Sequence, residues 1–504
     1  MIPFQAPVDD IFHSLRSVAR ADRLPGWDAD LAREIVDHFA ALAEGALAPL
    51  NAPGDRQGCR LDNGRVRMPD GFADAYRQLA EGGWQGLTAP EEFGGQGMDH
   101  LTAAAVSEIF SGANHALQMV TGLVPGMVST LMAHGTEAQR ARYIPQLTSG
   151  DYLATMCLTE AGAGSDLSRI RCRAVPDGDH WRIEGEKIFI SGGDQDMSQG
   201  ILHLVLARSG APQDGLRGLS LFLCPSEIDG VRTPVTVTRI EEKLGLHASP
   251  TCQLAFDGAR AELVGEPGRG LAAMFTMMNH ARLDVALQGV GHAARAHAIA
   301  AAYAAGREQG RLPDGSPAML DDHLDVRRML DEQRDLTRAA RGMVHLALVE
   351  LERGDRPALV EFLTPVCKIY ATEAGLRAAD LGIQILGGYG YLEEYGLSQI
   401  WRDARITAIY EGANGIHALG LATRGLRLDG GAAIGQFADL VAGLAPDDAA
   451  LRGNLADWTN RARRLAATGD VRAEAHDFAQ ETAALLAAAV RARLGLAGSR
   501  PETE

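Results

Sequence analysis

Hydrophobic side chains change their spacing twice along the chain, and the changes divide it into helical, strand-rich and helical stretches. From residue 1 to about 155 apolar side chains follow the helical period of about 3.6 residues, as in the segment 31–47. From about 156 to 265 short β-branched and aromatic runs alternate with turn residues, a pattern typical of strands. The helical period returns from about 266 to 428.

The segments that fit each pattern best give the expected elements. Helices are expected over 31–47, 72–79, 101–129, 137–147, 274–305, 320–351 and 357–386. Strands are expected over 181–190, 201–207, 219–223, 231–240 and 252–256. Several short strands in one block predict a compact β-barrel or sandwich. Long helices that are apolar over much of their circumference predict a bundle.

A Gly/Ala linker is expected at 429–433, followed by helix up to about Leu496. The predicted fold is therefore α+β and mostly α. It has an N-terminal helical domain (1–155), a small middle β-domain (156–265), a C-terminal four-helix bundle (266–428) and a C-terminal helical extension (429–504). This order of domains does not by itself define a chemistry.

Composition narrows the class of protein. The 504 residues, 46% of them apolar, have the length of about three domains and can bury a large core. The net charge of −17 argues against a nucleic-acid partner and against an anionic membrane surface. No run of about 18 apolar residues is present, so no membrane span is expected.

The six cysteines are scattered and form neither a CxxC motif nor a Cys/His cluster. We therefore expect reduced, buried thiols, with no metal site and no disulfide framework. The N-terminal residues lack the basic region and apolar core of a secretory signal. Together these features predict a cytoplasmic protein.

One stretch of the predicted bundle carries a candidate catalytic base. The apolar run 406–410 ends on Glu411 and Gly412, and a glycine after a helical segment is a stop signal. Glu411 is therefore expected at a helix end and not on a solvated helix face. A carboxylate among Ile, Tyr and Ala loses hydration, which raises its pKa toward the range of a general base. The alternative is a capping turn with an incidental glutamate.

A second candidate is the glycine-containing stretch 156–166, Met-Cys-Leu-Thr-Glu-Ala-Gly-Ala-Gly-Ser-Asp. It is not a dinucleotide fingerprint, because the third glycine is missing, and it is not a P-loop, because no Gly-Lys-Ser/Thr follows. Its backbone can approach a flat ligand closely, and Thr159 and Ser165 offer hydroxyls. The alternative is an ordinary turn that enters the β-domain.

Several motifs in a fixed order together resemble the acyl-CoA dehydrogenase family. The stretch 156–166 is similar to the first signature of that family, and Tyr410-Glu411-Gly412 is similar to its catalytic-base motif. The other matching motifs are 384–391 with Glu394 and Arg402-Asp403, 87–95 and 243–249. Residues 48–59 and the extended termini are similar to the branch that includes methylthiopropanoyl-CoA dehydrogenases.

The resemblance implies a flavoenzyme that oxidises an acyl-CoA thioester to the trans-2-enoyl-CoA. FAD is then the cofactor, and an electron-transfer flavoprotein is the expected acceptor. Glu411 is the implied base for the α-proton, while a β-hydride passes to flavin N5. Two hydrogen bonds, one of them from the Glu411 backbone N–H, would polarise the thioester carbonyl. A homodimer or homotetramer is expected, because some FAD contacts in the family cross between subunits.

Individual site residues follow from the same resemblance. The FAD contacts that it implies are Met156, Cys157, Leu158, Thr159, Ser165, Phe189, Ile190, Ser191, Arg307, His323, Gln384, Gly387, Gly388, Ala413 and Gly415. The implied substrate contacts are Ser165, Asn279, Arg282, Tyr410 and Gly412.

The chain departs from the family pattern at several of these places. The aromatic-glycine pair expected after Arg307 is absent, and Leu324 stands where a glutamine often contacts FAD. Ala413 and Gly415 replace the usual threonine and glutamine that follow the Glu-Gly pair. These changes weaken the expectation for FAD affinity but leave the base in place.

Two alternatives stay open. An acyl-CoA oxidase of the same fold would differ only in using oxygen as its acceptor. A non-catalytic or nucleic-acid-associated member of the fold would present a basic stripe on the C-terminal extension. The arginines of that extension are interspersed with aspartates and glutamates, which favours a solvated helical face.

Overall fold

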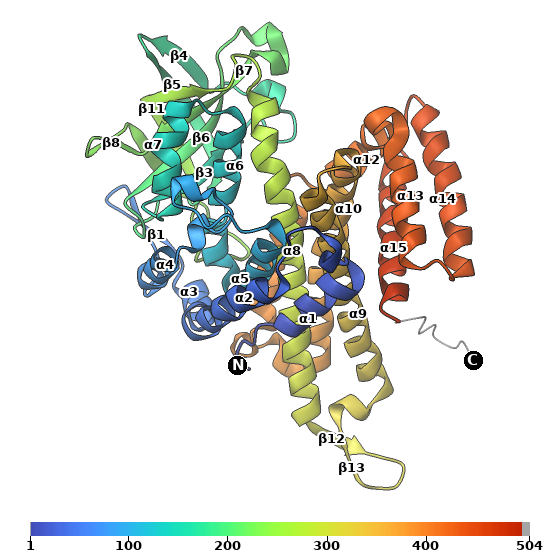
Figure 1. Cartoon of the computed structure of the whole chain (residues 1–504). Coiled ribbons are helices and arrows are strands. Elements are labelled where there is room, and N and C mark those ends of the chain that lie inside the picture. The colour runs from blue at the N-terminus through green and yellow to red at the C-terminus, as the bar shows by residue number, and fades with distance from the viewer. Residues whose placement is uncertain (1, 496–504) are drawn as a thin grey trace. The chain divides into compact units, whose positions relative to one another are not determined.

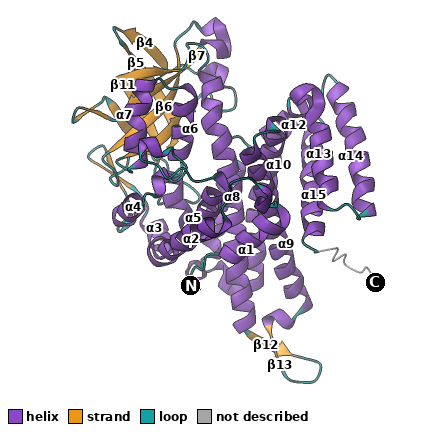
Figure 2. Cartoon of the chain, in the orientation of Figure 1, coloured by secondary structure: helices purple, strands orange, loops and turns teal. Residues whose placement is uncertain are grey.

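The computed structural model describes residues 2–495 and contains two compact units. The helical unit is formed by described residues within 1–45, 99–113 and 282–504, and the sheet unit by 46–98 and 114–281. Helices predominate throughout, and one main sheet lies in the sheet unit (Figures 1 and 2). The fold class expected from the sequence is confirmed. Residues 496–504 of the expected extension lie outside the described residues.

The main sheet has seven strands. They are β3 (Tyr152–Cys157), β4 (Arg173–Asp177), β5 (His180–Ser191), β6 (Gly200–Arg208), β7 (Leu219–Pro225), β10 (Val235–Ile240) and β11 (Thr251–Val264). The pairings run from β11 through β5, β4, β6 and β7 back to β11. This closed circuit makes the domain a small barrel, since β7 removes the free edges of β6 and β11. Every residue of β6 and β7 is buried.

Helices and two small hairpins complete the sheet unit. The helices are α3 (Asn51–Gln57), α4 (Phe72–Glu81), α6 (Val124–His134) and α7 (Glu137–Thr148). The hairpins are β1 (Arg60–Asp62) with β2 (Arg65–Arg67), and β8 (Glu227–Ile228) with β9 (Val231–Arg232). Thr136 begins α7 with a capping box, in which its side chain accepts from the Gln139 N–H.

The helical unit is built on α9 (Leu324–Arg353) and α10 (Pro357–Leu386), which pack against each other. Its other helices include α1 (Val8–His13), α2 (Ala29–Leu42), α11 (Leu397–Ala404), α12 (Asn414–Thr423), α13 (Ala432–Leu444), α14 (Ala449–Ala467) and α15 (Ala475–Arg493). Two long helices, α5 (His100–Thr121) and α8 (Gly270–Gly306), contribute residues to both units. A hairpin of β12 (Glu308–Arg311) and β13 (Pro317–Met319) follows α8.

Several expected boundaries are wrong. Strands β1, β2 and the start of β3 lie within the stretch expected to be helical, because a three-residue charged hairpin gives no alternating pattern. The strand expected over 231–240 is split into β9 and β10, since Pro234 has no N–H for a ladder. The helices expected over 101–129 are α5 and α6, but α6 continues to His134, and α5 is interrupted at Asn114, whose φ of −158° and ψ of 84° are not helical.

The C-terminal extension also differs from the expectation. The linker expected at 429–433 is present in part, since Asp429 and Gly430 have non-helical φ values of 48° and 62°, but α13 already begins at Ala432. The described residues of the extension form three helices that pack around Trp458, which is fully buried. The Trp458 ring lies 4.5 Å from that of Phe437 and 6.3 Å from that of Phe362 in α10, so the extension is part of the core of the helical unit.

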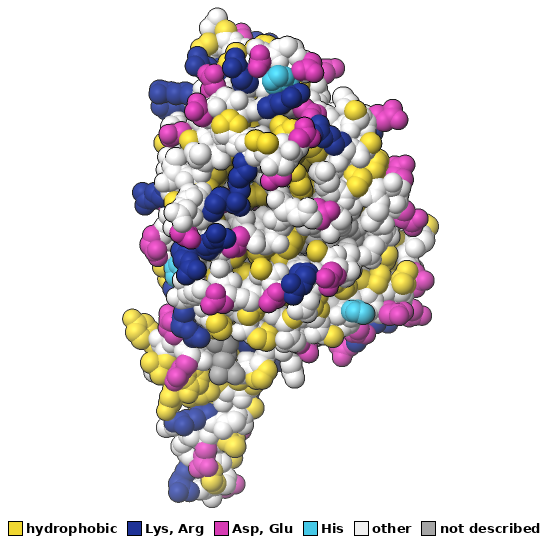
Figure 3. Space-filling view, turned by 90° about the vertical axis from the view of Figure 1, so that its left-hand side faces the viewer, with side chains coloured by type: hydrophobic (Ala, Val, Ile, Leu, Met, Phe, Trp, Pro, Cys, Tyr) yellow, Lys and Arg dark blue, Asp and Glu magenta, His cyan; other side chains and the backbone are white. Residues whose placement is uncertain are grey.

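All six cysteines are unpaired, and five of them are buried. Among the described residues no single helix is long and apolar enough to cross a membrane, although α5 and α6 taken together as a bent pair meet the criteria of length and composition. In the view of Figure 3 the acidic and basic side chains are interspersed over the visible face.

Candidate active site

Glu411 lies in a tight turn between two helical segments of the helical unit. A short 3₁₀ helix ends at Ala408, and α12 begins at Asn414. Glu411 has a φ of 53°, and Gly412 has a φ of 96°. A left-handed conformation is costly for a residue with a side chain. A Cβ on Gly412 would come within 2.9 Å of His417 Nε2, so only glycine fits after Glu411.

The carboxyl group of Glu411 is dehydrated. The residue is half-buried, but its Oε2 atom is buried and has no hydrogen-bond partner among the described residues. Burial raises the pKa of Glu411 to about 7, Arg282 and Lys368 oppose that rise, and Asp284 adds to it. The raised pKa expected from the sequence is therefore found, and burial is its main cause.

Three side chains hold the backbone of the turn. His417 Nε2 donates to the Glu411 carbonyl oxygen at 3.0 Å, and Arg282 Nε donates to the same oxygen at 3.4 Å. Lys368 Nζ donates to the Gly412 carbonyl oxygen and to Asn414 Oδ1, each at 2.9 Å. Two of the donors, Arg282 and Lys368, are basic side chains, so the carbonyl oxygens of the strained turn face positive charge.

Lys368 is fully buried in α10. Burial lowers the pKa of Lys368 to about 7, with Glu411 and Glu373 acting in the opposite direction. Burial also lowers the pKa of His417 to about 3, so its ring is neutral at neutral pH and donates through Nε2–H. Because Lys368 and Glu411 both titrate near neutrality, the protonation state of each depends on the other.

Tyr410, the residue before Glu411, is fixed by side chains of α8. Its hydroxyl donates to Gln288 Oε1, and Gln288 Nε2 donates to Asp284 Oδ2 at 3.0 Å. Ser107 Oγ of α5 donates to the other oxygen of Asp284. Burial raises the pKa of Tyr410 well above its ordinary value, so the hydroxyl stays protonated. This series of hydrogen bonds, from Ser107 to Tyr410, therefore fixes one end of the turn.

A second group of predicted residues lies in the sheet unit, where β3 and β5 end. Lys187 Nζ of β5 donates to the Leu158 carbonyl oxygen and to Glu160 Oε1, each at 2.9 Å. The Ile188 N–H donates to the Thr159 carbonyl oxygen at 2.9 Å. These bonds hold the loop after β3 against β5. Added Cβ atoms on Gly162 and Gly164 would meet nothing within 4 Å, so the loop backbone is accessible to a ligand.

The end of β5 presents an unusual aromatic residue. Phe189 has a φ of 60° and is 60% exposed, whereas Ile190 is buried and Ser191 is half-buried. An exposed aromatic ring on strained backbone is a candidate platform for a flat ligand. Cys157 is fully buried, and burial raises the pKa of its thiol to about 12. Among the predicted contacts, Cys157 can therefore offer only its backbone.

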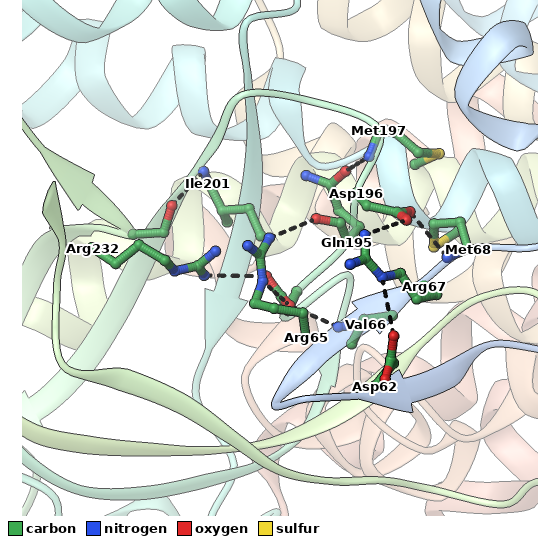
Figure 4. A network of polar contacts seen from close by, with 12 residues as sticks. Asp62, Arg65, Val66, Arg67, Met68, Gln195, Asp196, Met197, Ile201 and Arg232 are labelled. Carbon is green, nitrogen blue, oxygen red and sulfur yellow. Dashed lines mark hydrogen bonds and ion pairs between the residues drawn. The ribbon is translucent and has the colours of Figure 1, made fainter. Parts of the chain in front are cut away.

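A polar network fixes the loop that follows Phe189–Ser191 (Figure 4). The buried Asp194 accepts hydrogen bonds from Arg65 Nε at 2.8 Å and from the Val66 N–H at 2.9 Å. Arg232 adds a third bond to Asp194 at 3.3 Å. Asp196 accepts from the Met68 N–H at 3.0 Å. The β1–β2 hairpin is thereby joined to the loop beside the aromatic platform.

A third group lies around the end of α8 and the end of α10. Arg307 is exposed, and its guanidinium carbon lies 5.7 Å from the centre of the Tyr389 ring. Gly387, Gly388 and Gln384 are exposed nearby in sequence, and added Cβ atoms on both glycines would meet nothing within 4 Å. His323 is exposed as well, with Nε2 donating to the Gln309 carbonyl oxygen at 2.7 Å.

Comparison with known proteins identifies the framework that carries these groups. Three acyl-CoA dehydrogenase models match: the N-terminal domain at 30–151, the middle domain at 155–259 and the C-terminal domain at 268–426. The chain belongs to the acyl-CoA dehydrogenase family. As a member of that family it is an oxidoreductase that acts on an acyl-CoA.

Relatives of the acyl-CoA dehydrogenase family match at different lengths. A 3-methylmercaptopropionyl-CoA dehydrogenase from Ruegeria pomeroyi is 40% identical over 92% of this chain and 82% of its own length. The structure of butyryl-CoA dehydrogenase from Megasphaera elsdenii matches with a TM-score of 0.68 and 27% identity over 79% of this chain and 98% of its own. ACDH-11 from Caenorhabditis elegans, solved with C11-CoA, has a TM-score of 0.82 and 22% identity over 99% of this chain and 89% of its own. This last likeness shows that the fold, extension included, is shared.

The structure brings part of the predicted acyl-CoA dehydrogenase site together within the helical unit. Glu411, Gly412, Tyr410 and Arg282 form one cluster. Ala413 caps α12, and Gly415 lies exposed in its first turn. Asn279 lies on α8 one turn before Arg282, and Ser165 is exposed on the loop after β3.

Sequence reasoning missed Lys368, His417, Asp284 and Gln288. Lys368 gave one usable signal, because it is a lone cation within the apolar run 362–371, where an unpaired charge would be costly. The other three are ordinary polar residues on helices, and nothing in their local pattern distinguishes them from surface positions.

Proposed function

We propose that this chain oxidises an acyl-CoA thioester to the trans-2-enoyl-CoA, with Glu411 as the base. The observation that carries the proposal is the buried, unpartnered Oε2 of Glu411, whose pKa is about 7. A base with that pKa is divided between its two protonation states at neutral pH, which suits proton abstraction. The family and its named relatives supply the substrate class.

Each residue in and around the Glu411–Gly412 turn has a separate role in the proposed reaction. Glu411 accepts the α-proton on its carboxylate and becomes neutral, so the cost of burying its charge falls during the step. Arg282 and Lys368 keep a fraction of Glu411 ionised beforehand. The Glu411 backbone N–H, on the rigid left-handed turn, is the expected donor to the thioester carbonyl. Tyr410, fixed by Gln288, keeps the turn from relaxing.

The residues around Phe189 fit FAD. The accessible backbone of 158–164, Thr159 and the exposed Phe189 ring would contact the flavin. Across a subunit interface, Arg307 with Gln384, Gly387 and Gly388 of a second copy of this chain would contact the phosphate and adenine parts. When bound, FAD supplies the acceptor for the hydride that leaves the β-carbon. Ala413 and Gly415 offer no side-chain hydrogen bond, so we expect FAD to be held mainly by the other residues.

We propose an electron-transfer flavoprotein as the electron acceptor and a homo-oligomer as the working form. Family resemblance supports both. Tyr389 and Tyr391, 42% and 84% exposed beside Gly388, are aromatic residues of the kind enriched at interfaces. Multi-angle light scattering of the FAD-loaded protein tests the oligomer, and a monomer would exclude it.

The acceptor is tested separately. Peroxide formed stoichiometrically with the enoyl product would instead establish an oxidase. The nucleic-acid alternative has little support, because arginines of the extension are paired with acids: Arg461 with Glu481, Arg464 with Glu474 and Arg472 with Asp470.

The direct test of the reaction is a steady-state assay with an artificial electron acceptor and a panel of acyl-CoA thioesters. The panel includes 3-methylthiopropanoyl-CoA, butyryl-CoA and longer straight chains, because relatives act on short acyl groups by name. Mass spectrometry of the product should show the loss of two hydrogens. An FAD-loaded protein that oxidises no member of the panel would refute the proposal.

A further inference from the structure

Side-chain hydrogen bonds connect the C-terminal extension to the turn that carries Glu411. Gln480 on α15 donates from Nε2 to both carboxylate oxygens of Glu373 on α10, at 3.2 and 3.1 Å. Asn414 Nδ2, in the first turn of α12, donates to Glu373 Oε1 at 3.2 Å. The other end of Asn414 accepts from Lys368 at 2.9 Å. One continuous path of hydrogen bonds therefore joins α15 to the Glu411–Gly412 turn.

We infer that Gln480 is a positioning residue for the catalytic turn, and that the extension is a working part of the active site. Gln480 fixes the Glu373 carboxylate, and Glu373 in turn orients Asn414 and keeps Lys368 charged beneath Gly412. This inference rests on the proposed role of Glu411 as base.

The physical reason lies in the charges that face Lys368. Glu411 and Glu373 favour its protonated form, while burial and Arg282 oppose it. Glu373 has no ion-pair partner within 4.0 Å among the described residues; its recorded contacts there come from the two amides of Gln480 and Asn414. Amide donors stabilise a carboxylate without neutralising its charge, so Glu373 keeps its full field on Lys368.

The charge of Lys368 affects the pKa of Glu411. Glu411 faces Arg282 and Lys368, which lower its pKa, and Asp284, which raises it; neutral His417 and protonated Tyr410 complete its surroundings. Without the Gln480 donors the Glu373 carboxylate would no longer be held in place, so it could turn away from Lys368. The charged fraction of Lys368 would then fall and the pKa of Glu411 would rise. The base would then be less ionised at neutral pH.

Docking of the extension does not depend on Gln480. The buried face of α15 is formed by other side chains, among them Phe478, Ala479 and Leu486, and Trp458 donates to Thr482 at 2.9 Å. A Gln480→Met substitution, which keeps the shape of the side chain but removes its donors, should leave α15 in place. The effect on the turn can therefore be separated from unfolding.

The test compares Gln480→Met with Gln436→Met in the full-length, FAD-loaded protein. Gln436 is a half-buried glutamine on α13 of the same extension, which makes it a matched control. We expect Gln480→Met to move the acidic limb of the kcat profile to higher pH and to lower kcat at pH 7 roughly threefold. KM and FAD content should stay unchanged, and Gln436→Met should behave as the parent.

A second measurement does not require turnover. The pH dependence of the stability difference between each protein and its Glu411→Gln counterpart reports the titration of Glu411. Its midpoint should move to higher pH in the Gln480→Met background and not in the Gln436→Met background. A midpoint that does not move refutes the inference even if the parent oxidises no thioester, whereas failure of the parent in the assay bears on the proposed function alone.

A double-mutant cycle tests whether Gln480 and Glu373 act through one path. Glu373→Gln should change the profile in the same direction as Gln480→Met, and the double variant should add little to either single change, because all act through one path. Fully additive effects, or equal effects of Gln480→Met and Gln436→Met, would show that Gln480 has no positioning role.

Discussion

The Lys368 ammonium donates a 2.9 Å hydrogen bond to the carbonyl oxygen of Gly412, the residue directly after the proposed base. The fully buried lysine thus acts on Glu411 in two ways. It holds the strained backbone in place, and its charge counteracts the rise in the Glu411 pKa that burial imposes.

Lys368→Met is expected to raise the pKa of Glu411 above its present value of about 7, since one of two opposing cations is lost. Below its pKa, the ionised fraction of a carboxylate falls about tenfold for each unit by which the pKa rises. The rate of thioester oxidation at pH 6–7 should therefore drop by about tenfold and recover at higher pH. Stopped-flow measurement of flavin reduction against pH gives the result.

Lys368→Arg is the control for that substitution, because it keeps a charge in the same region. Its profile should lie closer to that of the parent. If Lys368→Met lowers the rate equally at every pH, the lysine contributes to geometry alone and the electrostatic part of the account fails.

Glu411→Gln is expected to change the pH dependence of stability. The folded pKa of Glu411 is raised from its ordinary value of 4.5 to about 7. The stability that protonated Glu411 contributes to the folded protein is fully present below pH 4.5 and is lost as pH rises through 7. The side chain of the variant does not titrate. The free energy of unfolding of the variant, relative to that of the parent, should therefore rise by about 1–3 kcal/mol between pH 5 and 8. Urea unfolding at several pH values measures the difference, and a constant difference would mean that Glu411 is solvated.

Phe189→Gly is expected to separate stability from cofactor affinity. The φ of 60° costs a phenylalanine about 1 kcal/mol, and the ring is 60% exposed, so little burial is lost. The free energy of unfolding of the FAD-free protein should change by less than about 1 kcal/mol. FAD affinity should fall by about tenfold or more, as measured by fluorescence titration. Unchanged affinity would remove Phe189 from the cofactor site.

Asp194→Asn is expected to destabilise the sheet unit by about 2 kcal/mol, because a buried carboxylate that accepts from Arg65, Val66 and Arg232 loses its charge. Asp62→Asn is the control, because Asp62 lies in β1 of the hairpin that Asp194 binds. Asp62 is half exposed and lies 3.9 Å from Arg67, and such surface pairs contribute about 0–1 kcal/mol. Equal losses in urea unfolding would show that the network is not structural.

The sequence predicts the parts of this molecule that depend on local pattern. Glu411 could be placed at a helix end with a raised pKa because an apolar run and a glycine flank it. The fold class could be predicted because the spacing of apolar side chains changes along the chain from a helical period to short strand-like runs and back. The barrel closure, in which β7 pairs with β6 and β11, could not, since it joins strands whose separation in sequence carries no signal.

The support of the turn could not be predicted for the same reason. Lys368 and Gly412 are 44 residues apart, and Gln480 and Glu373 are 107 residues apart. Each pair meets only because α10, α12 and α15 pack together. The three helices of the extension were missed as separate elements because alanine-rich sequence gives a helical signal without marking its ends.

The central claim is that Glu411 removes the α-proton of an acyl-CoA. Its most direct test is anaerobic mixing of the FAD-loaded parent and the FAD-loaded Glu411→Gln variant with the best thioester of the panel, followed by flavin absorbance. The parent should bleach within a single turnover, and the variant should bind the same thioester but bleach at least a hundredfold more slowly. A Glu411→Gln protein that bleaches at the rate of the parent would contradict the account.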